Sequence, residues 1–347
     1  MKRVLLILGL IGLLLTVSGC LFPFNLVVEG PEGKLAVVLG PERGYEPFPT
    51  GGAVWLLDAS GALERPLLEL GEREGAGDLA WSPSGDELLG VVLEVEGEFM
   101  TPKEWRLLRL PLEGEPEVLL RTEYPLTSPT YTQTGSAVLY IAAPEEAPEL
   151  HWLDLVSGED ELVEKDILTY LPFHGEVLAV SSAGEFKGPD GDTLASFNCP
   201  EEDCQLFLLL WPKLFLDISP TGEFLGLVVA DRPGLTTPEV DPVTSLYLVN
   251  LEEGTAERLA TPALSPSFSP DGTKLVFTAG TPDGKQFVYV YDLDSQENTQ
   301  LPGSEGAFWV RWGQTGIIAA VEDEEGRDRL LRWDGAGWRE IGFQPRD

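Results

Sequence analysis

The sequence that decides the fold is Phe268-Ser269-Pro270-Asp271-Gly272-Thr273-Lys274-Leu275-Val276-Phe277. Its first half has the chemistry of a tight turn, because proline presets φ and glycine accepts a positive φ. Its second half opens Lys274–Ala279, a run rich in the residues that strands favour. We therefore expect this turn to lead into a strand, and we compare the rest of the chain with it.

The same turn recurs four more times. Each copy has five positions: a large apolar residue, a small residue, either proline or glutamine, a small polar residue, and glycine. The copies are Trp81–Gly85, Tyr131–Gly135, Ile218–Gly222 and Trp312–Gly316. Weaker copies end at Gly33 and Gly175. The glycines at positions 33, 85, 135, 175, 222, 272 and 316 stand 52, 50, 40, 47, 50 and 44 residues apart, which is the spacing of four-stranded propeller blades.

Further β-rich runs complete each repeat. A third strand is expected at Val54–Asp58, Leu150–Leu155, Ser245–Leu251, Phe287–Leu293 and Leu330–Asp334, and a fourth strand follows it. The sequence thus predicts an all-β fold, a single β-propeller of four-stranded blades over residues 24–347. We expect seven blades and leave six or eight open. A generic β-sandwich is the alternative, and it would make the near-constant spacing of the turns a coincidence.

A family resemblance rests on the reference turn. Phe268–Phe277, followed by Val288–Asp294, resembles the WD40-like repeat of TolB-type propellers. The resemblance covers nearly all of residues 24–347 and implies the fold rather than a function, because such blades serve in binding modules and in enzymes alike. TolB-type proteins place an α/β domain before six blades, whereas this sequence predicts seven blades and no such domain. The partners of that family therefore do not carry over.

Residues 1–19 predict an export signal that is cleaved. A basic start, Met1-Lys2-Arg3, precedes the apolar run Val4–Val17, and small residues stand before Cys20. A retained membrane anchor is the alternative, but the apolar run is shorter than the roughly 20 residues that a span needs. Cysteine after small residues resembles the lipobox of bacterial lipoproteins, which implies that Cys20 becomes the first mature residue and carries acyl chains such as palmitate.

The same resemblance implies a location. Residues 20–23 would form the lipidated cysteine and a short linker to the propeller. We expect an extracytoplasmic, lipid-anchored protein, because several acyl chains hold a protein at a bilayer far better than one does. Leu21, rather than an aspartate, follows the cysteine. That favours the outer membrane, facing the periplasm, in a two-membrane envelope, and the outer face of the cell membrane otherwise.

The two remaining cysteines lie close together. Cys199 and Cys204 flank Pro200-Glu201-Glu202-Asp203. Outside the cytoplasm such a pair predicts a structural disulfide that closes a small loop. A redox-active pair is the alternative, but the spacing is not C-x-x-C and no basic residue nearby would lower a thiol pKa.

The charge of the chain excludes several partners. Lys and Arg total 23 and Asp and Glu total 58, a formal net charge of −35. Phosphate backbones are bound by clustered cations, so no nucleic-acid partner is expected. Only two histidines occur, His151 and His174. No metal or other cofactor is predicted. The acidic excess is interpreted first as a solvated surface and second as a face for a basic partner, with calcium binding third because no D-x-[DN]-x-[DN]-G loop occurs.

Two sets of residues are candidates for a site. Asp217 and Arg311 stand just before turn motifs, on strands expected to line the centre. A ligand in the channel, a buried ion pair and plain solvation near the channel mouth are all open there. The second set lies on long loops between second and third strands, at Gly40–Ala53, Glu94–Glu104, Ala183–Gln205 and Ala230–Ser245. These loops carry Tyr45, Phe48, Phe99, Phe186 and the Cys199–Cys204 pair, and we expect them to form the binding face, with tolerated insertion as the alternative.

These features favour binding over catalysis. The sequence has no G-x-S-x-G, H-E-x-x-H or phosphate-binding G-x-x-x-x-G-K-[ST] motif. We therefore name no catalytic residue and expect a monomeric, membrane-anchored propeller that acts as a protein-binding scaffold or envelope-complex component, with an envelope or periplasmic protein as partner. The alternative is an enzyme that acts on carbohydrate or peptide through carboxylates in a central pocket, as glycosidases use two acids.

Overall fold

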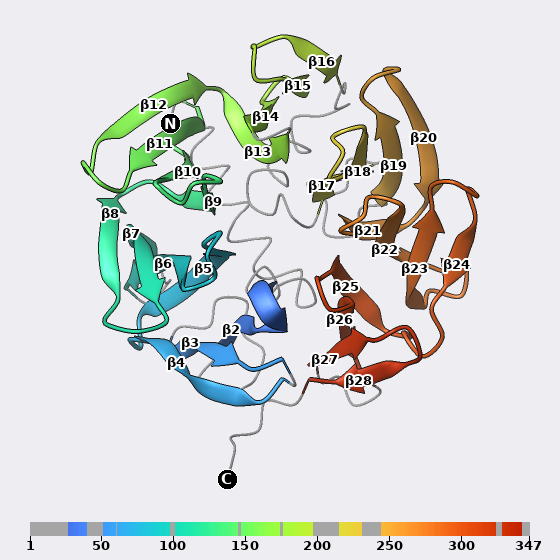
Figure 1. Cartoon of the computed structure of the whole chain (residues 1–347), viewed down its shortest axis with the longest axis horizontal. Coiled ribbons are helices and arrows are strands. Elements are labelled where there is room, and N and C mark those ends of the chain that lie inside the picture. Colours follow the sequence, from blue (N-terminus) through green and yellow to red (C-terminus); the bar gives the residue numbers. More distant parts are fainter. Residues whose placement is uncertain are drawn as a thin grey trace. The chain divides into compact units, whose positions relative to one another are not determined.

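The structure is a computed structural model that describes residues 27–39, 51–59, 61–97, 101–144, 147–173, 176–196, 215–230, 244–323 and 328–341. Within these residues the strands form seven four-stranded antiparallel sheets, and each sheet consists of four strands that are consecutive in the chain (Figure 1). The predicted fold class, an all-β propeller of seven four-stranded blades, is confirmed. No helix of the described residues is long and apolar enough to cross a membrane.

The first three sheets contain the strands β1 (Val27–Glu29), β2 (Leu35–Leu39), β3 (Gly52–Leu57) and β4 (Leu63–Leu70); β5 (Glu74–Trp81), β6 (Glu87–Glu96), β7 (Thr101–Pro111) and β8 (Glu117–Thr122); and β9 (Leu126–Tyr131), β10 (Ala137–Ala142), β11 (Glu149–Asp154) and β12 (Asp160–Lys165). A short 3-10 turn, η2 (Pro31–Gly33), joins β1 to β2.

The other four sheets contain β13 (Ile167–Phe173), β14 (Glu176–Ser181), β15 (Glu185–Lys187) and β16 (Thr193–Ser196); β17 (Leu216–Ile218), β18 (Phe224–Ala230), β19 (Thr244–Asn250) and β20 (Thr255–Ala260); β21 (Ala263–Phe268), β22 (Lys274–Gly280), β23 (Gln286–Asp292) and β24 (Asn298–Gln300); and β25 (Ala307–Trp312), β26 (Ile317–Glu322), β27 (Asp328–Trp333) and β28 (Trp338–Glu340).

The chain divides into two compact units. One contains Ala36–Leu56, Glu64–Lys165 and the residues up to Val28, and the other contains Glu29–Leu35, Leu57–Leu63 and the residues from Asp166 onward. The second and third sheets therefore lie within the first unit, and the fourth to seventh sheets lie within the second.

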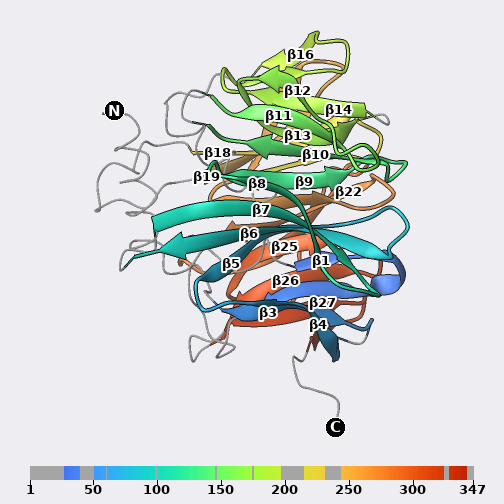
Figure 2. The same cartoon turned by 90° about the vertical axis from the view of Figure 1, so that its left-hand side faces the viewer.

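Burial follows the order of the strands within a sheet. All six residues of β10, a second strand, are buried, whereas five of the six residues of β12, a fourth strand, are exposed. In the first unit Leu89 and Val91 of β6 pack in one apolar cluster with Val138 of β10, so the second and third sheets bury their faces against each other. Figure 2 shows these two sheets lying side by side. An apolar face buried in this way is the main favourable term in folding.

The repeated turns have one geometry. In four of them the glycine donates its N–H to the carbonyl of the small residue three positions earlier, at 2.8–3.0 Å, and has φ of 70–73°; these are Gly85, Gly135, Gly222 and Gly272. The hydroxyl of that small residue accepts the N–H of the residue that opens the next strand, as Ser269 Oγ does from Lys274 at 2.9 Å. The repeat therefore uses serine or threonine at this position because the hydroxyl satisfies a backbone donor.

The last turn departs from this pattern because the Glu29 side chain occupies the space where the serine side chain would lie. Gly313 replaces the serine, and a Cβ built on it would lie 1.7 Å from Glu29 Oε2. The Glu29 side chain is 5% exposed, and its Oε1 lies 3.5 Å from Arg332 Nη2 and accepts the Thr315 hydroxyl. Arg332 Nη1 also donates to the Ala59 carbonyl at 2.6 Å. These contacts join residues of the first sheet and its loop to the seventh sheet, across 273–303 positions of sequence.

Two predicted loops are shorter than expected. β6 and β7 form a long hairpin, so only residues 97–100 separate them, and the Glu94–Glu104 interpretation was wrong at both ends. Residues 185–196 form β15 and β16, so the join between the second and third strands of the fourth sheet is only 182–184. The physical reason is the alternation Glu185-Phe186-Lys187, which buries Phe186 and leaves the flanking charges half-buried, as a strand does.

We predict that Gly313→Ala destabilises the protein. The new methyl group would overlap the Glu29 carboxylate, and overpacking of this kind costs about 1–3 kcal/mol. The free energy of unfolding from urea titration measures the effect. Gly337→Ala is the control, because a Cβ on Gly337 meets no atom within 4 Å. Equal unfolding free energies for the two variants would contradict the close approach of Glu29 and Gly313.

We predict that Asp271 stabilises its turn in a pH-dependent way. Its carboxylate accepts the Ser269 hydroxyl at 2.6 Å and the N–H and hydroxyl of Thr273 at 3.0 and 2.9 Å, and these bonds lower its pKa from 3.8 to about 2. Since the pKa is depressed in the folded state, the stabilisation is present above pH about 4 and is lost as the pH falls through about 2.

The measurement is the urea midpoint of Asp271→Asn against the wild type as a function of pH. The difference should be largest above pH about 4 and should shrink toward pH about 2. Asp294→Asn, at an exposed position in a neighbouring turn, matches the change in charge. A difference that stays constant across this range would mean that the hydrogen bonds to Asp271 do not form in solution.

Candidate functional site

The two residues predicted to lie at the centre occupy first strands of the second unit. Asp217 lies in β17 and Arg311 lies in β25, the first strands of the fifth and seventh sheets. The first strand of the sixth sheet, β21, contacts both of these strands. The structure therefore places Asp217 and Arg311 on either side of one strand, and the residues of β21 decide how the two interact.

The carboxylate of Asp217 is surrounded by donors. Its Oδ2 accepts the N–H of Phe268 at 2.7 Å, and the Ser267 hydroxyl and the N–H of Ile218 also bond to it. Burial raises the pKa of Asp217 above its usual value, and the positive charge of Arg311 is the largest of the influences that oppose the rise. The hydrogen bond from Phe268 joins the Asp217 carboxylate of β17 to the backbone of β21.

Arg311 lies across the same strand. Its Nη1 donates to the Pro266 carbonyl of β21 at 2.9 Å, whereas its Nη2 is buried and has no hydrogen-bond partner among the described residues. Burial lowers the pKa of Arg311, and the negative charge of Asp217 opposes that change. Arginine nevertheless remains protonated in proteins, so the site contains a partly buried cation and a buried anion.

Ser267 joins this pair to the next strand. Its Oγ accepts the N–H of Trp312 at 3.1 Å while its hydroxyl bonds to Asp217. Bonds thus run from β25 through β21 to β17. We define Asp217, Pro266, Ser267, Phe268, Arg311 and Trp312 as the inner-strand network. Asp217 and Arg311 each bond to β21 rather than to each other, and they influence each other only through their charges.

The first unit contains a similar link that the sequence analysis missed. Asp78 of β5 is 8% exposed, and its Oδ2 accepts the N–H of Ser128 in β9 at 2.8 Å. Asp78 stands four residues before Ser82 of its turn, and Asp217 stands two residues before Ser219 of its own. An aspartate shortly before the turn motif could have identified Asp78 from the sequence. The number of residues between the aspartate and the turn differs between the two sheets, and this difference concealed the pattern.

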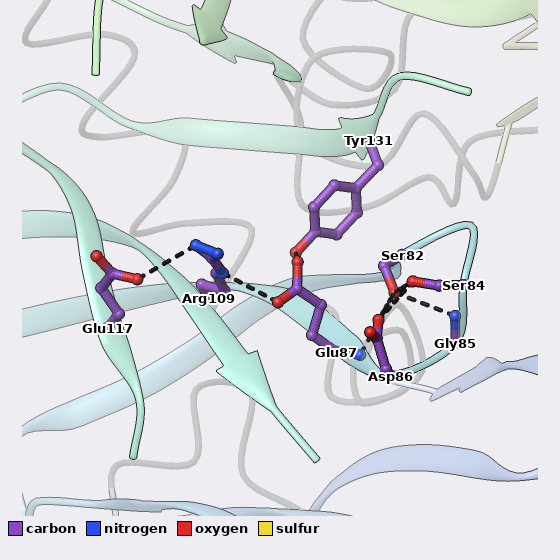
Figure 3. A network of polar contacts seen from close by, with 8 residues as sticks. All are labelled: Ser82, Ser84, Gly85, Asp86, Glu87, Arg109, Glu117 and Tyr131. Atoms are coloured by element: carbon purple, nitrogen blue, oxygen red, sulfur yellow. Dashed lines mark hydrogen bonds and ion pairs between the residues drawn. The ribbon is translucent and has the colours of Figure 1, made fainter. Parts of the chain in front are cut away.

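A second polar network lies beside the turn of the second sheet (Figure 3). Glu87 Oε1 accepts the Tyr131 hydroxyl at 2.9 Å, and its Oε2 accepts Arg109 Nε at 2.9 Å. Arg109 also lies 3.4 Å from Glu117. Burial, then the hydrogen bond to Glu87, raises the pKa of Tyr131 well above its usual value. This network too joins adjacent sheets, because Tyr131 belongs to β9 and Glu87 to β6.

The loop candidates divide into two groups. Phe186 was predicted to lie on a binding loop, but it belongs to β15, is 2% exposed and packs with Leu178 and Leu225 in an apolar cluster. That interpretation was wrong, because the aromatic ring completes a buried face. The remaining candidates lie outside the described residues; they are Cys20, Tyr45, Phe48, Phe99, Cys199 and Cys204. Among the residues that the structure does describe, no group of three or more His, Cys, Asp or Glu side chains is placed to hold a metal ion.

Comparisons with known proteins support the fold. No family model and no curated protein sequence matches the chain. Among solved structures, puromycin hydrolase aligns over 88% of this chain and 49% of its own, with 15% identity and a TM-score of 0.58. The β-propeller domain of the Trilobed protease from Pyrococcus furiosus aligns over 78% and 85%, with 15% identity and a TM-score of 0.54.

A structure of putative TolB from Agrobacterium tumefaciens aligns over 80% of this chain and 83% of its own, with 15% identity and a TM-score of 0.43. This chain spans about half the length of puromycin hydrolase. At this level of identity the likeness shows the fold alone. The fold places this chain in the class of seven-bladed β-propellers. The TolB-type resemblance of the repeats remains a prediction.

We predict that Asp217→Ala destabilises the protein by about 1–3 kcal/mol, because it leaves the Phe268 N–H without its acceptor. Asp294→Ala, at an exposed position, is the control and should change the free energy of unfolding by no more than about 0.5 kcal/mol. Urea titration of both variants measures the difference. An Asp217→Ala variant as stable as the wild type would show that the network contributes nothing to the fold.

Proposed function

We propose that this chain is a lipid-anchored, extracytoplasmic propeller that binds another protein as a scaffold or envelope-complex component. The observation that carries the proposal is the inner-strand network. The Asp217 carboxylate accepts the Phe268 N–H and the Arg311 guanidinium donates to the Pro266 carbonyl, so both candidate central residues bond to the backbone of β21 and join sheets. In this proposal the exposed strands and loops bind the partner, as in other proteins in which a rigid scaffold positions functional loops.

The anchor in this proposal is Cys20. A basic start, a short apolar run and small residues before a cysteine are the sequence features of a lipoprotein signal. Acylation would hold the propeller at a membrane surface, where a partner in the same envelope reaches a high effective concentration. Leu21 follows the cysteine and favours the outer membrane as the location of the protein if the cell has a two-membrane envelope. In a single-membrane cell the protein would lie on the outer face of the cell membrane.

The partner face in this proposal consists of loops between second and third strands. Tyr45, Phe48 and Phe99 are the aromatic residues that these loops carry, and aromatic side chains are enriched where interfaces bury their centres. The corrected strand bounds move the Cys199–Cys204 pair to the join between β16 and β17. Such joins lie on the same face of a propeller as those loops, so the predicted disulfide would still border it.

A second candidate is an enzyme that acts on peptide. Propellers of a hydrolase and of a protease are among the similar folds, although the match to puromycin hydrolase covers only half of that protein. This candidate would place the chemistry in residues other than the inner-strand network. It predicts hydrolysis of peptide by the purified chain, which a scaffold would not show.

The experiment is in-cell crosslinking of the lipidated protein and of Cys20→Ala, followed by purification and identification of what is captured. We expect Cys20→Ala to lose labelling by a radioactive fatty acid and to leave the membrane fraction, and we expect envelope proteins that only the anchored form captures. Asp294→Asn is the control, because it changes an exposed side chain and leaves both the proposed acylation site and the proposed partner face intact.

Two results would count against the proposal. Unchanged fatty-acid labelling of Cys20→Ala would refute the anchor. Capture that does not differ from that of an unrelated lipoprotein would refute the scaffold, and turnover of a peptide library by the same preparation would then favour the enzyme.

A further inference from the structure

The outer part of the third sheet exposes apolar side chains. Trp152 of β11, Val156 of the following turn, and Leu162 and Val163 of β12 are 37%, 89%, 46% and 51% exposed. Seven large apolar side chains are exposed in the described residues, and these four lie within twelve positions of one another. Exposed apolar side chains that gather on one element mark an interaction site more often than scattered ones do.

Strand β12 is an open sheet edge. The strand order of the third sheet is β12-β11-β10-β9, so among the described strands none pairs with the outer side of β12. β12 pairs with β11 through Glu161 and Trp152 and through Leu162 and His151. An open edge presents unpaired N–H and C=O groups to any extended segment, and natural proteins usually cover or charge such an edge.

A bulge makes Val163 the residue most available to a partner. The register shifts between Leu150 and His151, so that Glu164 and Leu162 have partners on β11 and Val163 has none. The extra residue of a bulge is left out of the ladder, and bulges re-aim side chains at sheet edges. The equivalent extra residue of β8, Leu119, packs against an apolar cluster, whereas Val163 is half exposed.

Side-chain bonds hold β12 in place at both ends. Asp160, its first residue, accepts the Tyr140 hydroxyl at 2.9 Å and lies 3.3 Å from His151 Nδ1. Lys165, its last residue, lies 2.9 Å from Glu149 of β11. Tyr140 and His151 stack with their ring centroids 5.2 Å apart. A strand fixed in this way loses little conformational entropy when a partner pairs with it.

The charge around β12 selects the kind of partner. Residues 159–165 contain Glu159, Asp160, Glu161, Glu164 and one lysine, a net charge of −3 in a chain of net charge −35. Asp160 is occupied by Tyr140 and His151, whereas Glu159 and Glu161 are exposed side chains of the β12 edge. An extended segment that alternates basic and apolar residues complements both the carboxylates and the apolar side chains.

We propose that β12 is a docking edge for an extended, basic and apolar segment of a partner protein, which adds to the third sheet as a fifth strand. Main-chain hydrogen bonds to the open edge supply the pairing, and alternate side chains of the segment meet Leu162, Val163 and the carboxylates. The proposal goes beyond the loop face of the proposed function, and its test needs neither the anchor nor the loops.

The test uses a fluorescein-labelled hexapeptide that alternates lysine and valine, titrated with the purified chain and followed by fluorescence anisotropy. Leu162→Lys with Val163→Lys should weaken binding by at least about tenfold, because it removes the apolar contacts and adds charges that repel the peptide. Asn298→Lys with Thr299→Lys on the exposed strand β24 adds the same charge and should leave the dissociation constant unchanged.

A second peptide tests the pairing itself. Methylation of alternate backbone nitrogens removes the N–H groups that would join the ladder and should also weaken binding by at least about tenfold. If the β12 variant does not fold, hydrogen exchange of the wild type tests the pairing instead. The unmethylated peptide should then protect the amides of β12 from exchange. Absence of binding to the wild type, equal binding by the two variants, or equal binding of the methylated peptide would each overturn the proposal. None of these results would bear on the crosslinking experiment.

Discussion

Because no strand is shared between sheets of the described residues, adjacent sheets are joined by buried apolar clusters and by polar bonds that pass from one sheet to the next. Each sheet satisfies its own backbone by its ladder, but the first strand has only one neighbour in its sheet. Asp217 satisfies the Phe268 N–H, Ser267 satisfies that of Trp312, and Asp78 satisfies that of Ser128. Buried backbone donors of this kind are nearly always paired, and here acidic and hydroxyl side chains of the adjacent first strand supply the acceptors.

The last turn shows how one such contact changes a repeat. Four turns keep serine or threonine because its hydroxyl satisfies the next strand, whereas the seventh has Gly313. The carboxylate of Glu29 lies where a side chain would be, and Arg332 and Thr315 hold it there. A buried charge needs such partners. The glycine is therefore a consequence of a contact with the first strand, and local turn chemistry alone would favour serine.

Inner and outer strands carry different parts of the protein's chemistry. Asp78, Asp217 and Arg311 of first strands bond to the backbone of an adjacent sheet. The fourth strands are exposed and differ from one another, from the polar Asn298–Gln300 to the apolar Leu162 and Val163 of β12. The strongly negative charge of the chain adds a long-range attraction for basic partners, which salt would screen. Both proposals therefore place partner recognition at the exposed strands and loops.

The sequence by itself determined the repeat and the turns and favoured seven blades over six or eight, because these depend on local alternation and on proline and glycine at fixed spacing. It also singled out Asp217 and Arg311, although not how they interact. Only the tertiary structure decided that Phe186 is buried, that Asp78 joins two sheets and that Gly313 makes room for Glu29. Each of these depends on which residues of distant segments meet, and a pattern with a period of two along one strand contains no information about the neighbouring sheet.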